Sequence, residues 1–189
     1  MGDHMRLSRS ALGIVSFVGA DLIEPAPVMA APQPLLNKTV TLAWTAQSRL
    51  RDPDGKERQV NASIRYVIYI SSQGRLFERS SRSVGGRTQR GDVDPSATKT
   101  KLGETRGLRF EGNKLVANRG YSGGGGSGAM RAVATFDSSY SSCSLSVMVG
   151  KEKGGVIRRA GMDGVVRELL SVTTTGTTCS VQSGNAFAN

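Results

Sequence analysis

The sequence predicts an all-β fold, an antiparallel meander that forms a single barrel or sandwich. Three observations predict it: apolar and polar residues alternate over several segments, turn residues separate those segments, and no long amphipathic helical pattern occurs. The chain has 189 residues, of which 38% are hydrophobic, so it is long enough to bury one core. We therefore expect one β domain over residues 31–189, preceded by a signal peptide at residues 1–30.

The first two expected strands carry the clearest alternation. In residues 39–46 all four even positions are apolar, and Thr fills three of the four odd ones. These apolar residues are Val40, Leu42, Trp44 and Ala46. A turn at residues 51–56, which contains Pro53 and Gly55, leads to a second strand over residues 62–71. A turn at residues 72–74 then leads to a third strand over residues 75–80.

The second half of the chain predicts five further strands and one ambiguous segment. Residues 108–111 and 114–118 form a hairpin closed at Gly112-Asn113, and strands follow at residues 130–136, 143–149 and 173–181. Between residues 156 and 170 the apolar side chains fit either one short helix near residues 160–170 or a strand buried on both faces. These side chains are Val165, Val166, Leu169 and Leu170. Both alternatives stay open.

Two stretches lack any strand pattern. Residues 81–106 are polar and contain Gly85-Gly86, Gly91 and Asp94-Pro95, so we expect a long basic loop. Residues 122–128 read SGGGGSG, which by composition is a flexible linker or a hairpin loop. Because the glycine run leads into a strand and is not followed by Lys-Ser or Lys-Thr, it does not match a phosphate-binding loop.

The amino terminus predicts export. A short basic start at residues 5–10 precedes an uncharged, mostly apolar run at residues 11–20, and small residues allow cleavage after Ala30. The apolar run is shorter than the roughly 20 residues that a membrane-spanning helix needs, so we expect no transmembrane segment. The expected location is periplasmic or secreted.

Two cysteines agree with that location. Cys143 and Cys179 lie 36 positions apart, without a Cys-x-x-Cys spacing, and the single histidine, His4, falls in the expected leader. In an oxidising compartment the pair forms one disulfide, and two buried free thiols are the alternative. Without a mature histidine we expect no metal site, no cofactor and no serine–histidine catalysis.

Positive charge is the main chemical feature of the mature chain. The leader carries two of the 25 basic and three of the 15 acidic residues, which leaves a net charge of 23 − 12, or +11. Residues 75–119 contain eleven Lys or Arg against five acidic residues, a local excess of six. Such a patch attracts polyanions, and its candidate anion-binding residues are Arg79, Arg82, Arg87, Arg90, Lys99, Lys101 and Arg106. A purely solubilising charge is the alternative.

The lack of aromatic residues near this charge bears on the kind of partner that we expect. No aromatic residue lies between Phe77 and Phe110, so the patch lacks the stacking side chains of a nucleic-acid reader. For an exported protein the remaining anions are an acidic envelope polymer or lipid headgroups. The sequence does not indicate an oligomeric state.

The last third of the chain carries a resemblance. Residues 178–187, TCSVQSGNAF, together with Phe136-Asp137 ahead of Cys143, resemble small exported alphaproteobacterial proteins of unknown function. The resemblance implies an envelope location and a Cys143–Cys179 bridge. It brings no activity and no functional residue.

Three functions remain as hypotheses. The first is an exported, non-catalytic β domain that binds an anionic cell-envelope component through its basic surface. The second is a β-barrel that carries a small apolar ligand among Trp44, Tyr66, Ile68 and Phe136. The third is a hydrolase with paired carboxylates, drawn from Glu78, Glu104, Glu111 and Asp137.

Overall fold

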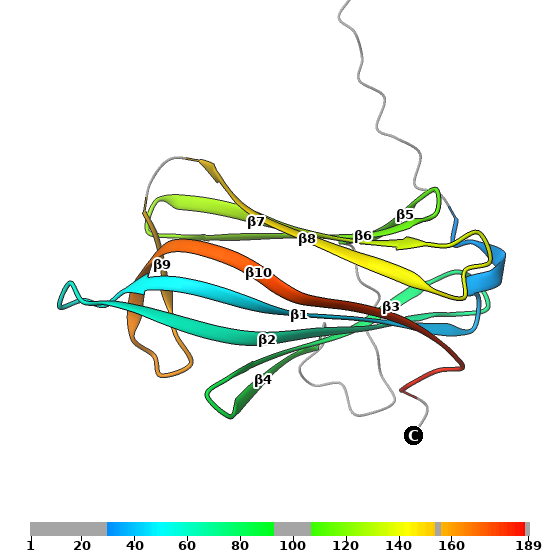
Figure 1. The fold of residues 1–189 in the computed structure, drawn as a ribbon, viewed down its shortest axis with the longest axis horizontal. Helices are drawn as coiled ribbons and strands as arrows, with labels where there is room; N and C mark the ends of the chain where they lie inside the picture. Colours follow the sequence, from blue (N-terminus) through cyan, green and yellow to red (C-terminus); the bar gives the residue numbers. More distant parts are fainter. Residues whose placement is uncertain (1–29, 93–106, 154–155, 188–189) are drawn as a thin grey trace, which may run out of the picture.

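The computed structural model describes residues 30–92, 107–153 and 156–187, and it confirms the all-β class (Figure 1). Within these residues the chain forms ten strands and one short 3₁₀ turn, η1 (Gln33–Leu35). The described part contains no helix long and apolar enough to cross a membrane. The expected signal peptide lies outside the described residues except for Ala30, and so do residues 93–106 of the expected loop.

Six strands form one antiparallel sheet that curls into a half-barrel. Its order is β4-β3-β2-β1-β10-β9, so β4 and β9 are its two edges. Strands β1 to β4 follow one another through tight turns, and the C-terminal strand β10 pairs with the other side of β1. The strands are β1 (Lys38–Arg51), β2 (Glu57–Ile70), β3 (Leu76–Val84), β4 (Arg87–Asp92), β9 (Ile157–Ala160) and β10 (Val166–Ser183).

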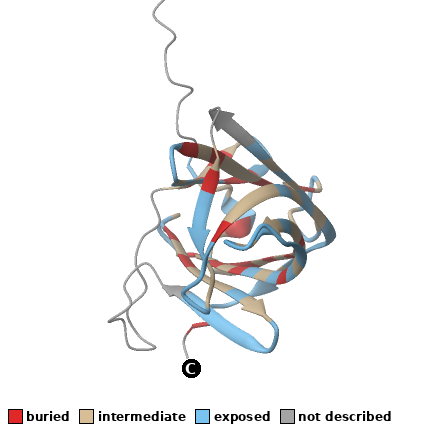
Figure 2. Cartoon of the chain, turned by 90° about the vertical axis from the view of Figure 1, so that its left-hand side faces the viewer, coloured by how far each residue is buried: buried red, intermediate tan, exposed pale blue. Residues whose placement is uncertain are grey.

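Four strands form a second antiparallel sheet that lies over the concave face of the first (Figure 2). Its order, β5-β6-β7-β8, is a simple meander. The first hairpin turns at Gly112-Asn113, as the sequence predicts. The strands are β5 (Leu108–Glu111), β6 (Lys114–Gly123), β7 (Gly126–Phe136) and β8 (Cys143–Lys153).

The interior follows the predicted alternation. Trp44, Ile68 and Phe136 are buried, and Val147 is half-buried and packs against them. The 3₁₀ turn places Leu35, which is fully buried, at the end of the molecule where β1 begins. That end of the sandwich is therefore filled by side chains.

A disulfide joins the two sheets along one seam. Cys143 at the start of β8 bonds to Cys179 of β10, with their Cα atoms 5.5 Å apart, as expected from the sequence. Further along the same seam the Thr174 hydroxyl donates a hydrogen bond of 3.0 Å to the carbonyl oxygen of Val147. These contacts hold β8 beside β10 although the two strands belong to different sheets.

The prediction of a loop at residues 81–106 is wrong for residues 81–92, which form a hairpin. Residues 81–84 continue β3 and residues 87–92 form β4, and the two strands pair through the turn Gly85-Gly86. Both glycines have positive φ, +53° and +78°, which a two-residue hairpin turn requires. Because this hairpin is at the edge of the sheet and largely solvated, its strands need no apolar alternation, and the sequence pattern therefore missed them.

The segment left open between helix and strand forms strands. Ile157–Ala160 pairs with the start of β10, and Gly161 and Gly164 lie in the turn between them. Ile157 is fully buried whereas Val166 is exposed. The apolar residues of this segment therefore do not share one buried helix face; they belong to two paired strands at the edge of the sheet.

The glycine run forms an ordered hairpin and not a flexible linker. Gly124 and Gly125, with φ of +61° and +88°, form the two-residue turn between β6 and β7. A Cβ atom on the preceding Gly123 would lie 2.1 Å from the carbonyl oxygen of Arg158, and Gly125 forms an isolated bridge with Val156. The absence of side chains thus lets β9 approach the second sheet.

Candidate functional site

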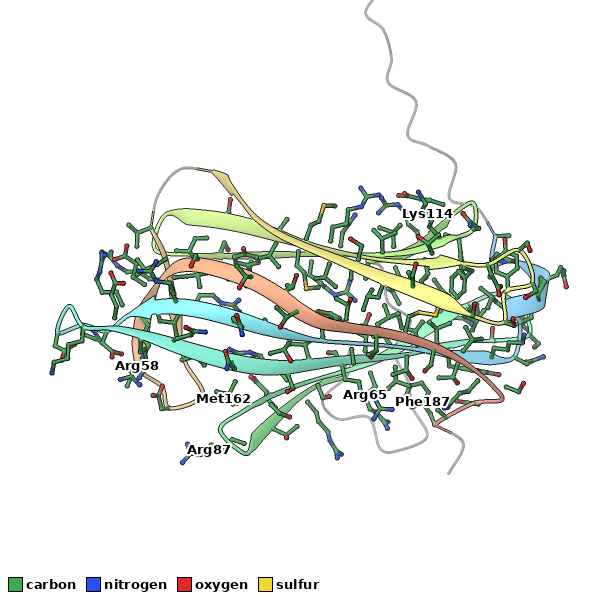
Figure 3. All side chains as sticks on the ribbon, viewed as in Figure 1. Arg58, Arg65, Arg87, Lys114, Met162 and Phe187 are labelled. Atoms are coloured by element: carbon green, nitrogen blue, oxygen red, sulfur yellow. A yellow bond between two sulfur atoms is a disulfide. The ribbon has the colours of Figure 1, made fainter. Side chains whose placement is uncertain are left out.

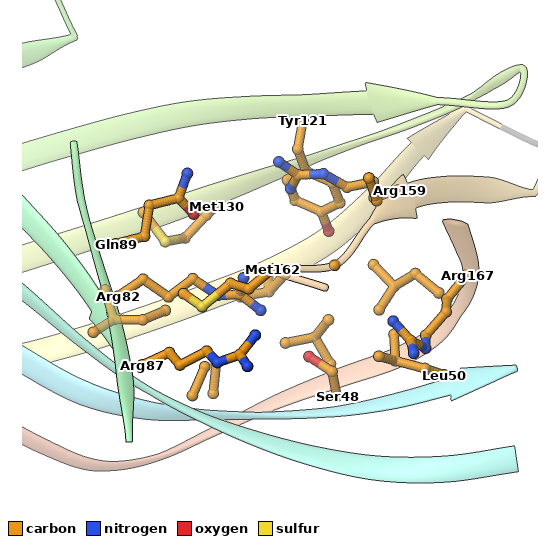
Figure 4. A pocket seen from close by; sticks show the side chains of 18 of the residues that line it. Ser48, Leu50, Arg82, Arg87, Gln89, Tyr121, Met130, Arg159, Met162 and Arg167 are labelled. Carbon is orange, nitrogen blue, oxygen red and sulfur yellow. The ribbon is translucent and has the colours of Figure 1, made fainter. Parts of the chain in front are cut away.

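An open cavity of about 890 Å³ lies between the two sheets at the end where β9 crosses the sandwich. Its walls come from both sheets, and its size falls within the range of small-molecule sites. Figure 4 shows the lining side chains from close by. Most of the wall is apolar and includes Trp44, Ala46, Leu50, Ala62, Ile64, Met130, Val149, Leu169 and Val172.

The cavity exists because the inward side chains become small along the first two strands. On β1 the inward positions run from Leu42 and Trp44 to Ala46 and Ser48. Ala46 is paired in register with Ala62 of β2, so two small side chains stand side by side. Large residues fill the other end of the sandwich, and here the same faces leave space. The sequence shows both alanines, but it does not show that they are paired, because the pairing depends on the register between β1 and β2.

Four arginines line this cavity, and three of them stand around its opening. Arg82 comes from β3, Arg87 from β4 and Arg159 from β9. Since β4 and β9 are opposite edges of one sheet, the curl of that sheet brings the arginines to a common opening. Figure 4 shows them around Met162, which lies in the turn between β9 and β10. The site therefore combines an apolar interior with a cationic rim.

The rim arginines lack carboxylate partners within the described residues. Arg82 and Arg87 form no hydrogen bond or ion pair there, and Arg159 has one described contact, its guanidinium lying 5.9 Å from the ring centre of Tyr121. Desolvation by the surrounding protein lowers the pKa of Arg82, and the positive charge of Arg159 lowers it further. Two like charges thus face each other across the opening.

The three rim arginines are exposed, whereas two less exposed arginines, Arg167 and Arg119, are paired with carboxylates. Arg167, also in the wall, binds Asp52 and Asp163 at 2.6 Å each, and these bonds raise its pKa. Arg119 of β6 pairs with the buried Glu78 of β3 across the interior. Among the four arginines of the cavity wall, the three rim arginines are therefore the ones without a carboxylate partner in the described residues.

The structure separates the seven predicted anion-binding residues into three groups. Arg82 and Arg87 reach the cavity, while Arg90 does not line it and lies on the opposite face of β4 by strand alternation. The Arg79 guanidinium lies 4.8 Å from the ring centre of Phe187, which the C-terminal tail packs against β3. The remaining three, Lys99, Lys101 and Arg106, lie outside the described residues.

Arg159 was missed by the sequence reasoning. It stands in a segment whose secondary structure stayed open, and it lies far along the chain from the basic stretch at residues 75–119. Only the curl of the sheet brings side chains of β9 and β3 to one cavity. Two of three rim residues were therefore among the predicted candidates.

The carboxylates considered for hydrolysis have separate surroundings. Glu78 is buried beside Arg119, and burial raises its pKa although the arginine opposes this shift. Glu111 accepts hydrogen bonds from Arg109 and from Arg131, the latter at 3.0 Å. The fourth candidate, Glu104, lies outside the described residues.

Asp137 follows β7 in a loop rich in serine. Partial desolvation opposes its ionisation, but hydrogen bonds from Ser142, Ser141 and Ser139 lower its pKa to about 2. The loop thus satisfies this carboxylate locally. None of the three described candidates lines the cavity.

Comparisons with protein-family models, with curated proteins and with solved structures found no match. The evidence for a function therefore lies in the geometry and chemistry of the cavity.

Proposed function

We propose that this protein is an exported, non-catalytic binding domain for a small anionic amphiphile. In this proposal the apolar part of the ligand lies in the cavity between the sheets, and its anionic head lies among Arg82, Arg87 and Arg159. One observation carries the proposal: three arginines without carboxylate partners in the described residues surround an apolar cavity of about 890 Å³. The proposal joins the two binding hypotheses from the sequence, an anion and an apolar ligand.

The physical reason is that each half of such a ligand meets the surface it prefers. Burial of an acyl chain against the apolar wall contributes about 0.8 kcal/mol per methylene group. A carboxylate or phosphate between Arg82 and Arg159 would relieve their repulsion and accept charge-assisted hydrogen bonds. The planar guanidinium matches such anions because it donates two parallel hydrogen bonds.

The disulfide supports the exported part of the proposal. Cys143 and Cys179 form a bridge between the two sheets, and structural disulfides of this kind are typical of oxidising compartments. A binding domain there would meet free amphiphiles from the surrounding envelope.

The test is a titration of the purified protein with dodecanoate below its micelle concentration. Trp44 is the single tryptophan and lines the cavity, so its fluorescence reports binding directly. We expect saturable binding of one ligand per chain. R82Q and R159Q should each weaken it about 10- to 100-fold, because a hydrogen bond to a charged group contributes about 1.5–3 kcal/mol.

R90Q is the matched control. Arg90 lies on the same hairpin as Arg82 and carries the same charge, but it does not line the cavity. We expect R90Q to bind dodecanoate within about twofold of the wild type, since surface charges away from the ligand are screened by salt. Equal losses in R82Q and R90Q would instead favour a polyanion on the outer basic surface. Absence of saturable binding would overturn the proposal.

A further inference from the structure

The β3–β4 hairpin places three hydrogen-bond donors on the face that it turns toward the cavity. Arg82 of β3 is paired in register with Gln89 of β4, and Arg87 stands two residues before Gln89, so all three share one face by strand alternation. All three line the cavity. Arg82 and Arg87 are diagonal neighbours across the two strands, about 7–8 Å apart at the backbone, which lets two long side chains reach one anion.

Arg159 of β9 brings a third guanidinium to the same opening from the other edge of the sheet. In Figure 4 its side chain and those of Arg82 and Arg87 surround Met162. Desolvation lowers the pKa of Arg82, and the positive charge of Arg159 lowers it further, so the two arginines are close enough to interact. The three cations therefore form one cluster.

This cluster carries three positive charges that nearby carboxylates do not balance. Among the described residues, no Asp or Glu lines the cavity. The nearest acidic pair, Asp52 and Asp163, is balanced by Arg167 and Arg58, which bind these two carboxylates. A carboxylate head group would neutralise one of the three rim charges. A phosphate monoester has a charge of about −1.5 to −2 at neutral pH and three strong acceptor oxygens, so it matches the rim more closely.

We propose that the head group of the ligand is a doubly charged phosphate monoester, held by Arg82, Arg87 and Arg159, and that the ligand is a single-chain alkyl or acyl phosphate. This inference rests on the proposed function and narrows its ligand class. Each guanidinium donates paired hydrogen bonds to phosphate oxygens, and the amide of Gln89 adds two further N–H donors. Carboxylate amphiphiles bind the same cavity more weakly, because they leave part of the rim charge unmatched.

The experiment compares three ligands with the same chain length by isothermal titration calorimetry at pH 8, each below its micelle concentration. The ligands are dodecyl phosphate, dodecyl methyl phosphate and dodecanoate. Dodecyl methyl phosphate keeps the chain and the phosphorus atom but carries one negative charge. We expect dodecyl phosphate to bind about tenfold more tightly than either of the others. This comparison uses the wild-type protein, so it does not depend on the folding of a variant.

A second pH value isolates the charge of the head group. The second pKa of a phosphate monoester is about 6, so dodecyl phosphate is doubly charged at pH 8 and singly charged at pH 5. Its advantage over dodecyl methyl phosphate should therefore fall from about tenfold at pH 8 to within about twofold at pH 5. An advantage that is the same at both pH values would overturn the inference.

The protein groups that face the head keep their charge over this pH range. The described titratable residues of the wall are four arginines and Tyr121, and both kinds of side chain hold their charge between pH 5 and pH 8. Desolvation opposes the ionisation of Asp52, but hydrogen bonds from Arg167 and Arg58 lower its pKa. A hydrogen bond from Arg167 also lowers the pKa of Asp163. Titration elsewhere in the protein affects both phosphates alike and cancels in their ratio.

R87Q and R90Q separate the rim from the general charge of the hairpin. Each removes one positive charge from β4, but Arg90 does not line the cavity. At pH 8 the advantage of dodecyl phosphate over dodecyl methyl phosphate should fall from about tenfold to about threefold in R87Q, and it should stay at about tenfold in R90Q. An equal advantage in the two variants would contradict the assignment of the head group to the rim.

The outcomes separate this inference from the proposed function. If dodecanoate binds with one ligand per chain and dodecyl phosphate binds no more tightly at pH 8, the inference fails and the proposed function stands. If inorganic phosphate alone binds as tightly as dodecyl phosphate, the site takes the anion without a chain, and both fail. Both also fail if none of the three amphiphiles binds.

Discussion

Reduction of the disulfide should destabilise the fold by an amount that the structure lets us estimate. The bridge closes a loop with a sequence separation of 36 between Cys143 and Cys179. In the chain-entropy model, opening a loop of this length returns about 13 cal/mol/K to the unfolded chain, which corresponds to about 4 kcal/mol at 25 °C. Both cysteines are partly buried and pack against the core, so reduced thiols keep those contacts. The expected loss is therefore mainly entropic.

The assay is urea unfolding of the oxidised and reduced protein, followed by the fluorescence of Trp44. With a denaturant dependence of about 2 kcal/mol/M, typical of a domain of this size, the midpoint should fall by about 2 M on reduction. C143A/C179A is the matched variant, and it should be no more stable than the reduced protein because it also loses the sulfur contacts. The reduced protein should still fold, because Thr174 and Val147 keep their hydrogen bond along the same seam.

A difference below about 1 kcal/mol between oxidised and reduced protein would refute this reasoning, since it would mean that the bridge does not constrain the unfolded chain. Recovery of both cysteines as free thiols from exported protein would refute it as well.

Two further predictions concern the β6–β7 turn and the acid side of the pH profile. G123A should lower the free energy of unfolding by about 1–3 kcal/mol, because its Cβ would lie 2.1 Å from the backbone oxygen of Arg158. G120A on the same strand meets open space and should change the free energy of unfolding by less than about 0.5 kcal/mol. Urea unfolding measures both variants, and equal effects would contradict the close packing at Gly123. Arg167 holds the pKa of Asp163 well below its ordinary value of 3.8, so this contribution to stability is present above pH 4 and is lost as the pH falls below it. D163N should therefore show a shallower loss of thermal stability between pH 5 and pH 2 than the wild type, and an unchanged slope would contradict the assignment.

The fold could be predicted from the sequence where a strand has one buried and one solvated face. Val40, Leu42 and Trp44 alternate with threonine because one face of β1 meets the core, and the same period reveals β7 and β8. The paired cysteines added a correct contact between distant strands.

The pattern failed at the edges of the six-stranded sheet. Strand β4 is exposed at every described side chain, so its residues carry no apolar period, and only its turn glycines hint at a hairpin. Strand β9 has four residues, too few for a period to show. Both edges are held by backbone pairing, which side-chain patterns do not report.

The candidate site depends on just these edges. Arg82 and Arg87 could be named from local charge, but their meeting with Arg159 requires the curl of a six-stranded sheet. The cavity itself requires the register that places Ala46 beside Ala62. Curl and register arise from the whole sheet, and no local window of sequence contains them.

The central claim is that an apolar cavity with a cationic rim selects amphiphiles by the sign of their head group. The most direct measurement is the affinity of the wild-type protein for dodecanoate relative to dodecyltrimethylammonium, which carries the same chain length and the opposite charge. We predict that dodecanoate binds with one-to-one stoichiometry and at least about tenfold more tightly, because Arg82, Arg87 and Arg159 attract one head and repel the other. Equal affinities, or tighter binding of the cation, would contradict the account.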